Sequence, residues 1–165
     1  MKKALAVTVA IAILMAVAAY WVAAPYVVMH QLQRAAQARD IEALDAHVDF
    51  PALRGSLRSQ VSSTLENKMG NPKDNPIAAL GSAIGMAVAS PLIEIAVQPE
   101  SVAASLRSGH WEPVAATAAN PPEGDVKWTY EREGMGVFIA RSKDSFVLVR
   151  HGFADWKLSE IRLAR

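Results

Sequence analysis

The chain has 165 residues, of which 52% are hydrophobic, and its 17 basic and 16 acidic residues leave a net charge of +1. This length suggests one domain of ordinary size, and the balanced charge lacks the clustered excess of Lys and Arg that marks nucleic-acid binders. The absence of cysteine excludes disulfides, thiol catalysis, cysteine-ligated zinc, iron–sulfur clusters and a lipid-modified N-terminal cysteine.

The hydrophobic excess is concentrated at the N-terminus, where 24 of the 26 residues from 4 to 29 are apolar. Residues 4–24 are long enough to cross the hydrocarbon core of a bilayer as an uncleaved signal anchor. Two other interpretations stay open: a cleaved signal peptide with a small-x-small site at residues 16–18, and a buried core helix. Aromatic residues cluster at the far end of the span, as in an interfacial belt: Tyr20, Trp21 and Tyr26.

Residues 1–29 are therefore assigned to a signal anchor or transmembrane helix, and the flanking charges suggest its direction. Lys2 and Lys3 precede the apolar run and favour a cytoplasmic N-terminus, although Arg34 and Arg39 on the other side weaken this bias. The rest of the chain would then lie in a bacterial periplasm, held at the inner membrane, or be secreted there after signal cleavage. The lack of cysteine is compatible with that oxidising compartment.

The helical half of the domain is expected over residues 30–109. The first helix should continue through residues 30–36, which are good helix formers. Asp40 and Asp49 each stand where an N-cap is needed, and Pro51 fits the first turn of the helix that Asp49 opens. Apolar residues at every fourth position of that helix predict a buried stripe: Leu53, Leu57, Val61 and Leu65. Two arginines lie on a neighbouring face that should be solvated: Arg54 and Arg58.

A second apolar segment, residues 77–97, has 15 apolar positions in 21. Pro91 and Glu94 argue against a second membrane span, because a carboxylate at the centre of a span costs about 2.5–3.5 kcal/mol. Gly81 and Gly85 are spaced for close packing of this helix against a neighbour, in water or in a bilayer. We expect a buried helix broken near Pro91, and keep open a two-span arrangement that would place the C-terminal sheet in the cytoplasm.

The periodicity changes from helical to alternating after a short helix that starts at Pro99 and ends at Gly109. Residues 110–125 are rich in proline and alanine and should form the loop between the two halves. Residues 126–165 contain four short apolar runs joined by tight turns, which predict an antiparallel meander with a bulge near Ser159. Helices followed by strands indicate an α+β domain, in which several helices pack on a four-stranded sheet after the transmembrane helix.

The sequence contains no motif for catalysis, for a metal or for a cofactor. Its four histidines are scattered, without a spacing that binds metal: His30, His47, His110 and His151. Three tryptophans could line a ligand pocket, although aromatic residues of strands more often form the core of a sheet: Trp111, Trp128 and Trp156. We therefore expect no catalytic, metal-binding or cofactor-binding residues, and the tryptophans are a weak candidate pocket.

Several short segments occur in an order that spans nearly the whole chain: Pro25-Tyr26, Ala36 to Asp40, Val48 to Arg54, Pro99-Glu100, and Gly152 with Trp156-Lys157-Leu158. On these segments the chain resembles a bacterial family of unknown function, domain-of-unknown-function family 2939. The resemblance implies a membrane-anchored or exported protein and supplies no reaction and no catalytic residues. The order of helices and meander is also similar to cone-shaped ligand-binding domains of the nuclear-transport-factor type, an analogy at the level of the fold.

The sequence thus favours a non-enzymatic, membrane-anchored envelope protein whose domain binds a protein or an apolar ligand, and not nucleic acid. Much of its core should come from aromatic residues: Trp128, Phe138, Phe146 and Trp156. One alternative is a small hydrolase or isomerase with a pocket between helices and sheet. The other is a two-span membrane component that uses residues 77–97, with Gly81 and Gly85 at a helix interface.

Overall fold

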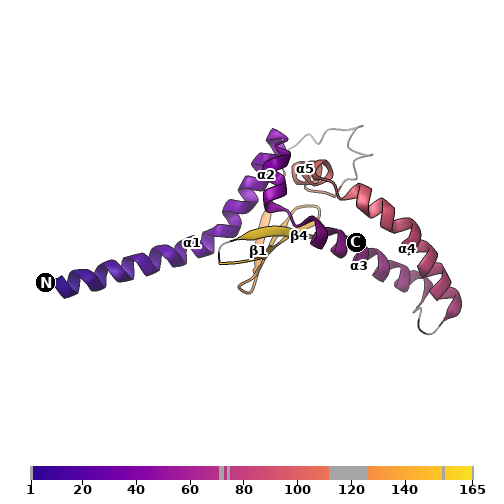
Figure 1. The fold of residues 1–165 in the computed structure, drawn as a ribbon, viewed down its shortest axis with the longest axis horizontal. Helices are drawn as coiled ribbons and strands as arrows, with labels where there is room; N and C mark the ends of the chain where they lie inside the picture. The colour runs from indigo at the N-terminus through magenta and orange to yellow at the C-terminus, as the bar shows by residue number, and fades with distance from the viewer. Residues whose placement is uncertain (1, 71–72, 74, 112–125, 154, 165) are drawn as a thin grey trace.

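The computed structural model describes residues 2–70, 73, 75–111, 126–153 and 155–164. Within these residues, five helices precede a four-stranded antiparallel sheet, which confirms the expected α+β class (Figure 1). The helices are α1 (Lys2–Ala38), α2 (Ile41–His47), α3 (Phe50–Met69), α4 (Pro76–Ala96) and α5 (Pro99–Ser108). The strands are β1 (Thr129–Glu133), β2 (Val137–Arg141), β3 (Ser145–Arg150) and β4 (Trp156–Arg162), in this order across the sheet.

Helix α1 is exposed in its N-terminal half and buried in its C-terminal half. The side chains of residues 7–20 are all exposed, whereas Met29, Leu32 and Ala36 have no exposed surface. The helix continues without a break through Pro25. The core begins at Ala24, inside the segment assigned to the anchor, so one helix serves both parts of the molecule.

The predicted helix caps at the two aspartates are confirmed. Oδ1 of Asp40 accepts a hydrogen bond from the backbone N of Ala43, and Oδ1 of Asp49 accepts one from that of Ala52, both at 3.0 Å. Each bond satisfies a backbone N–H that has no partner within its helix. The sharp turn between α1 and α2 is set by Arg39, whose φ of 56° is left-handed.

The predicted stripe of α3 is buried only in its first half. Leu53 and Leu57 are buried, but Val61 and Leu65 are half-buried. The reason is the position of the second half of α3, which extends away from the sheet beside α4 (Figure 1).

The expectation that residues 77–97 form a buried, broken helix is wrong on both points. Helix α4 runs unbroken through Pro91, and Asn75 caps its N-terminus by accepting hydrogen bonds from the backbone N of Ile77 and Ala78. Ala78 and Ile93 are buried, but most of its large apolar side chains are not. Pro91 is exposed within this unbroken helix.

The sheet is the predicted meander, and its helix-covered face holds the predicted aromatic core. Phe138, Phe146 and Trp156 are almost fully buried there, and Trp128 is half-buried against them. Val147 pairs with Glu160 and Leu148 pairs with Leu158, which leaves Ser159 as the extra residue of the predicted bulge. The expected loop at residues 110–125 lies almost entirely outside the described residues.

The connection between α2 and α3 is bonded to β4, and α5 is bonded to α1. Val48 forms an isolated parallel bridge with Leu158, and the backbone N of Asp49 donates to the carbonyl of Leu158 at 2.9 Å. Nη1 of Arg107 in α5 donates to the carbonyl of Ala36 at 2.7 Å, and burial lowers the pKa of Arg107 from its ordinary value. The N-terminal half of α1 and the α3–α4 hairpin project from opposite sides of this body (Figure 1).

Candidate functional site

The exposed half of α1 meets the sheet where its buried half begins. The ring of Tyr26 lies 4.7 Å from that of Phe138 and 5.6 Å from that of Tyr130, both edge to face. One helical turn nearer the N-terminus, the guanidinium of Arg132 donates to the carbonyl of Val22 at 3.1 Å. These contacts fix the direction in which α1 leaves the domain.

Two arginines of the sheet surround Trp21 at this junction, and we call the three residues the collar. The guanidinium of Arg150 lies 4.8 Å from the centre of the Trp21 ring, and that of Arg132 lies 6.0 Å away. Tryptophan at this level of an apolar helix is typical of a membrane interface. The collar was missed in the sequence because its arginines lie more than 100 residues after Trp21.

A second exposed surface covers α4. Six large apolar side chains line one face of the helix, and we call them the α4 stripe: Ile77, Leu80, Ile84, Val88, Leu92 and Ile95. Each of them is at least 58% exposed. No charged residue occurs from position 76 to position 93, so the stripe is a continuous uncharged surface. Surfaces of this kind mark contacts with proteins or membranes.

The opposite face of α4 is held against α3. Glu94 pairs with Nε of Arg54 at 2.9 Å and with Nη2 of Arg58 at 3.6 Å. Arg54 also donates to the carbonyl of Val97 at 3.3 Å, so the expectation that it is simply solvated is wrong. An added Cβ at Gly85 would lie 2.9 Å from Leu65, which shows close helix packing at one of the two predicted glycines. Gly81 is half-buried on the same helix.

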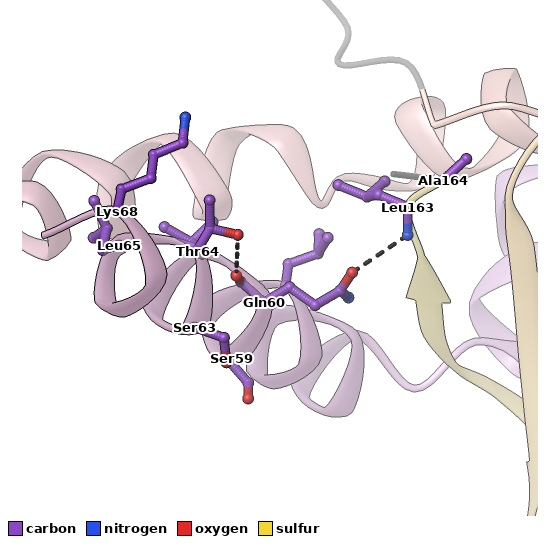
Figure 2. A pocket seen from close by; sticks show the side chains of 10 residues that line it. Ser59, Gln60, Ser63, Thr64, Leu65, Lys68, Leu163 and Ala164 are labelled. Carbon is purple, nitrogen blue, oxygen red and sulfur yellow. Dashed lines mark hydrogen bonds between the residues drawn. The ribbon is translucent and has the colours of Figure 1, made fainter. Parts of the chain in front are cut away.

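A groove of about 510 Å³ runs along α3 beside the C-terminal residues. Figure 2 shows Gln60 reaching from α3 to Leu163, whose backbone N donates to Oε1 of Gln60 at 3.3 Å. The lining residues are apolar, hydroxyl or amide, with one lysine: Leu57, Ser59, Gln60, Val61, Ser63, Thr64, Leu65, Lys68, Leu163 and Ala164. None of these side chains is a carboxylate or an imidazole, so the described lining residues offer no acid–base pair.

The structure places the three tryptophans predicted as a pocket among core residues, and they line neither of the two hollows described here. Trp156 is 1% exposed and Trp111 is 9% exposed, both in the hydrophobic core. The ring of Trp128 lies edge to face on Phe146 at 5.2 Å. The groove along α3 and a second hollow of about 370 Å³ between α1 and α2 are lined by other residues.

A family model described as a protein of unknown function (DUF2939) matches residues 14–104, more than half of the chain. The chain belongs to the DUF2939 family. No curated protein and no solved structure matches it. The DUF2939 match runs from within the exposed half of α1 to within α5, so it includes the α4 stripe and leaves the sheet outside.

One group of residues in this DUF2939 protein resembles a catalytic triad in composition. Nε2 of His151 lies 3.5 Å from Oδ2 of Asp49 and 3.4 Å from Oγ of Ser159. A triad requires the carboxylate on one ring nitrogen and the hydroxyl on the other, whereas here the same nitrogen faces both. The Ser159 hydroxyl also donates to the carbonyl of Lys157 within its own strand. This arrangement is that of a bulge and a helix cap.

The other close histidine–carboxylate pair is structural. Nδ1 of His110 lies 2.7 Å from Oδ2 of Asp144, a side chain that is almost fully buried. The same carboxylate accepts hydrogen bonds from the backbone N of Trp111 and of Ala164, each at 2.7 Å. Asp144 therefore joins the end of the helical half, a strand turn and the C-terminal residues. Across the described ranges, no three His, Asp or Glu side chains gather as metal ligands.

Two helices in the described part of the chain are long and apolar enough to cross a membrane, within Val7–Ala38 and Pro76–Ala96. Their surroundings differ. The apolar part of α1 stands alone, whereas α4 packs along the length of α3, which carries Arg54, Arg58 and many hydroxyl side chains. If α4 spanned a bilayer in this arrangement, α3 would have to enter it as well, at a cost of a few kcal/mol for each arginine.

Proposed function

We propose that this DUF2939 protein is a non-catalytic interaction protein of the bacterial inner membrane. Residues 4–24 anchor it, the N-terminus lies in the cytoplasm and the domain lies in the periplasm. The observation that carries this proposal is the continuity of α1, which passes from 14 exposed residues at positions 7–20 into the core without a linker. Such a helix holds the domain at a fixed height and orientation above the bilayer.

The α4 stripe is the surface that we propose for a partner protein with an apolar helical face. The α3–α4 hairpin projects away from the side on which α1 leaves the body (Figure 1). The hairpin therefore lies away from the anchoring membrane, and its residues Arg54 and Arg58 are both paired with Glu94. Binding in this mode uses apolar side chains at helical spacing.

Anchoring is tested by alkaline carbonate extraction and by N-terminal sequencing of the membrane fraction. We expect the full chain, beginning at Met1, to stay in the membrane pellet. A soluble protein that begins just after Ala18 would identify a cleaved signal peptide and overturn the anchor.

The orientation is tested in intact spheroplasts with a membrane-impermeant maleimide, which the cysteine-free sequence allows. We expect Lys143→Cys, an exposed turn residue of the sheet, to be labelled without lysis. Lys3→Cys is the control and should be labelled only after lysis. Protection of Lys143→Cys would support the two-span arrangement, in which the sheet is cytoplasmic.

The binding surface is tested by placing a photoreactive amino acid at Ile84 and, as the matched control, at Ser63 on the exposed polar side of α3. We expect a discrete cross-linked product in membranes from position 84 and none from position 63. Leu80→Glu should remove the product, because it places a charge in the stripe. Equal products from both positions, or no effect of Leu80→Glu, would refute this role of α4.

A further inference from the structure

The sheet has one end at which two of its turns lie side by side, and we call it the turn end. It consists of the β1–β2 turn at residues 134–136 and, between β3 and β4, of residues 151–153 and 155. In a meander these two connections fall at the same end, and the backbone N of Arg150 donates to the carbonyl of Gly136 at 2.9 Å. The remaining turn, at residues 142–144, lies at the opposite end.

The turn end points along α1 toward the anchor. Tyr130 contacts Tyr26, and Arg132 contacts Val22. Two residues of a strand cover about 6.6 Å, and four residues of a helix cover about 6 Å, so the order of these contacts shows that β1 and α1 run in opposite directions. Met135, which follows Arg132 in the chain, therefore lies on the side of the residues that precede Trp21. The exposed apolar run of α1 ends just before Trp21.

The tips of both turns carry a large apolar side chain that is exposed. Met135 stands between two glycines and is 69% exposed, and Phe153 follows Gly152 and is 70% exposed. Turn tips are usually polar. Both side chains lie at the end of the sheet that faces the anchor.

The arginines of the turn end differ from the other arginines of the sheet. Arg141 pairs with Glu131 at 2.8 Å, and Arg162 pairs with Glu160 at 3.1 Å. In the part of the chain that the structure describes, Arg132 and Arg150 have no carboxylate within ion-pair distance and lie instead against Trp21. Glu133, the carboxylate next to Arg132 in the sequence, faces Arg162.

We infer that the turn end is a second membrane contact, which binds the bilayer surface beside the anchor. Met135 and Phe153 enter the boundary between headgroups and acyl chains, and Arg132 and Arg150 bind the phosphates of anionic lipid headgroups. The domain is thereby held at the membrane by the anchor and by the two arginines of the collar. This inference rests on the proposed role of α1 as the anchor.

The test uses the full chain reconstituted in vesicles of phosphatidylcholine and phosphatidylglycerol. An environment-sensitive dye is attached to Met135→Cys or, as the matched control, to Lys143→Cys at the opposite end of the sheet. We expect a blue-shifted emission and strong quenching by lipids with a shallow nitroxide at position 135, and neither effect at position 143.

The headgroup contact is tested by adding Arg132→Gln and Arg150→Gln to the Met135→Cys protein. The equilibrium between bound and unbound turn end should weaken about fivefold for each arginine removed, and a similar loss should follow when phosphatidylglycerol is omitted. Arg141→Gln is the control, because that arginine is paired on the same sheet, and it should leave the quenching unchanged.

The outcomes separate the two proposals. Extraction of the protein from the vesicles by carbonate would overturn the anchor itself. Retention of the protein with equal, water-like emission at positions 135 and 143 would overturn the membrane contact alone. Quenching at position 135 that is insensitive to both arginine changes and to phosphatidylglycerol would refute the recognition of anionic headgroups.

Discussion

At the scale of single residues, Asp144 is the polar group on which the most contacts converge. Its carboxylate receives the backbone N–H groups of Trp111 and Ala164 and the ring of His110, and it is nearly without exposed surface. A buried carboxylate is stable only when such donors replace water. The turn at residues 142–144 is therefore also a clamp between the two halves of the domain.

We expect Asp144→Asn to lower the free energy of unfolding by about 1–3 kcal/mol. An amide can accept from one of the two backbone N–H groups, but its NH₂ group then faces the other. Chemical denaturation of the detergent-solubilised protein, followed by tryptophan fluorescence, measures the change. Asp45→Asn, an exposed change on α2, is the control and should stay within about 0.5 kcal/mol; an equal effect of the two changes would contradict the clamp.

Substitutions of Asp49 distinguish a structural role of this residue from a catalytic role. Asparagine caps helices about as well as aspartate, so Asp49→Asn should be nearly silent, whereas Asp49→Ala should cost about 1 kcal/mol. The same denaturation experiment measures both. If Asp49→Asn removed the cross-linked product from Ile84 in a fully folded protein, the residue would have a role beyond the cap of α3.

At the scale of elements, the α3–α4 hairpin has two faces with different roles. Its inner contact is made by the Arg54–Glu94–Arg58 group and by the close approach at Gly85. Its outer surface on α4 is the uncharged stripe. Arg54, Arg58 and Glu94 pair on the inner side of the hairpin, and the α4 stripe itself contains no charged residue, so the stripe brings no unpaired charge into a complex.

We expect Gly85→Leu to destabilise the hairpin by about 1–3 kcal/mol, because the new side chain occupies the space of Leu65. Gly85→Ala should have a smaller effect, since the end of the Leu65 side chain can move. Ala87→Leu is the matched control, as residue 87 is exposed on the same helix. Amide hydrogen exchange of α3 and α4 measures the change, and equal protection in the two leucine variants would refute close packing at Gly85.

At the scale of the whole molecule, α1 contains both the proposed anchor and part of the hydrophobic core. The residues up to Tyr20 are exposed, while Ala24, Val28, Met29 and Leu32 contribute to the core. Removing the exposed residues of α1 should therefore remove the proposed anchor and leave the hydrophobic core of the domain complete.

A chain that begins at Ala19 should therefore fold, with a Tm within a few degrees of that of the full protein in detergent. A chain that begins at His30 lacks Met29 and the other core residues before it. The cavity left in the core should lower the free energy of unfolding by about 2–5 kcal/mol. This chain should melt at least about 8 °C lower. Circular dichroism during heating measures both, and similar Tm values for the two fragments would show that α1 is not part of the core.

Local patterns in the sequence determine the elements of this protein. The caps at Asp40 and Asp49, the meander and the bulge at Ser159 follow from neighbours within a few residues, and the family follows from short segments of the same kind. Helical periodicity also identifies the faces of α4. It does not say which apolar face meets another element, and this is why the expected burial of residues 77–97 was wrong.

Only the tertiary structure decided which distant residues meet. Arg132 and Arg150 reach Trp21 because the strand order places two turns at the end of the sheet nearest the anchor. Met135 and Phe153 can be noticed in the sequence as apolar residues beside turn glycines, but their common direction follows only from the packing of the sheet along α1. The apolar run fixes what kind of environment the N-terminus requires, whereas the side of the domain that faces this environment depends on contacts between segments more than 100 residues apart.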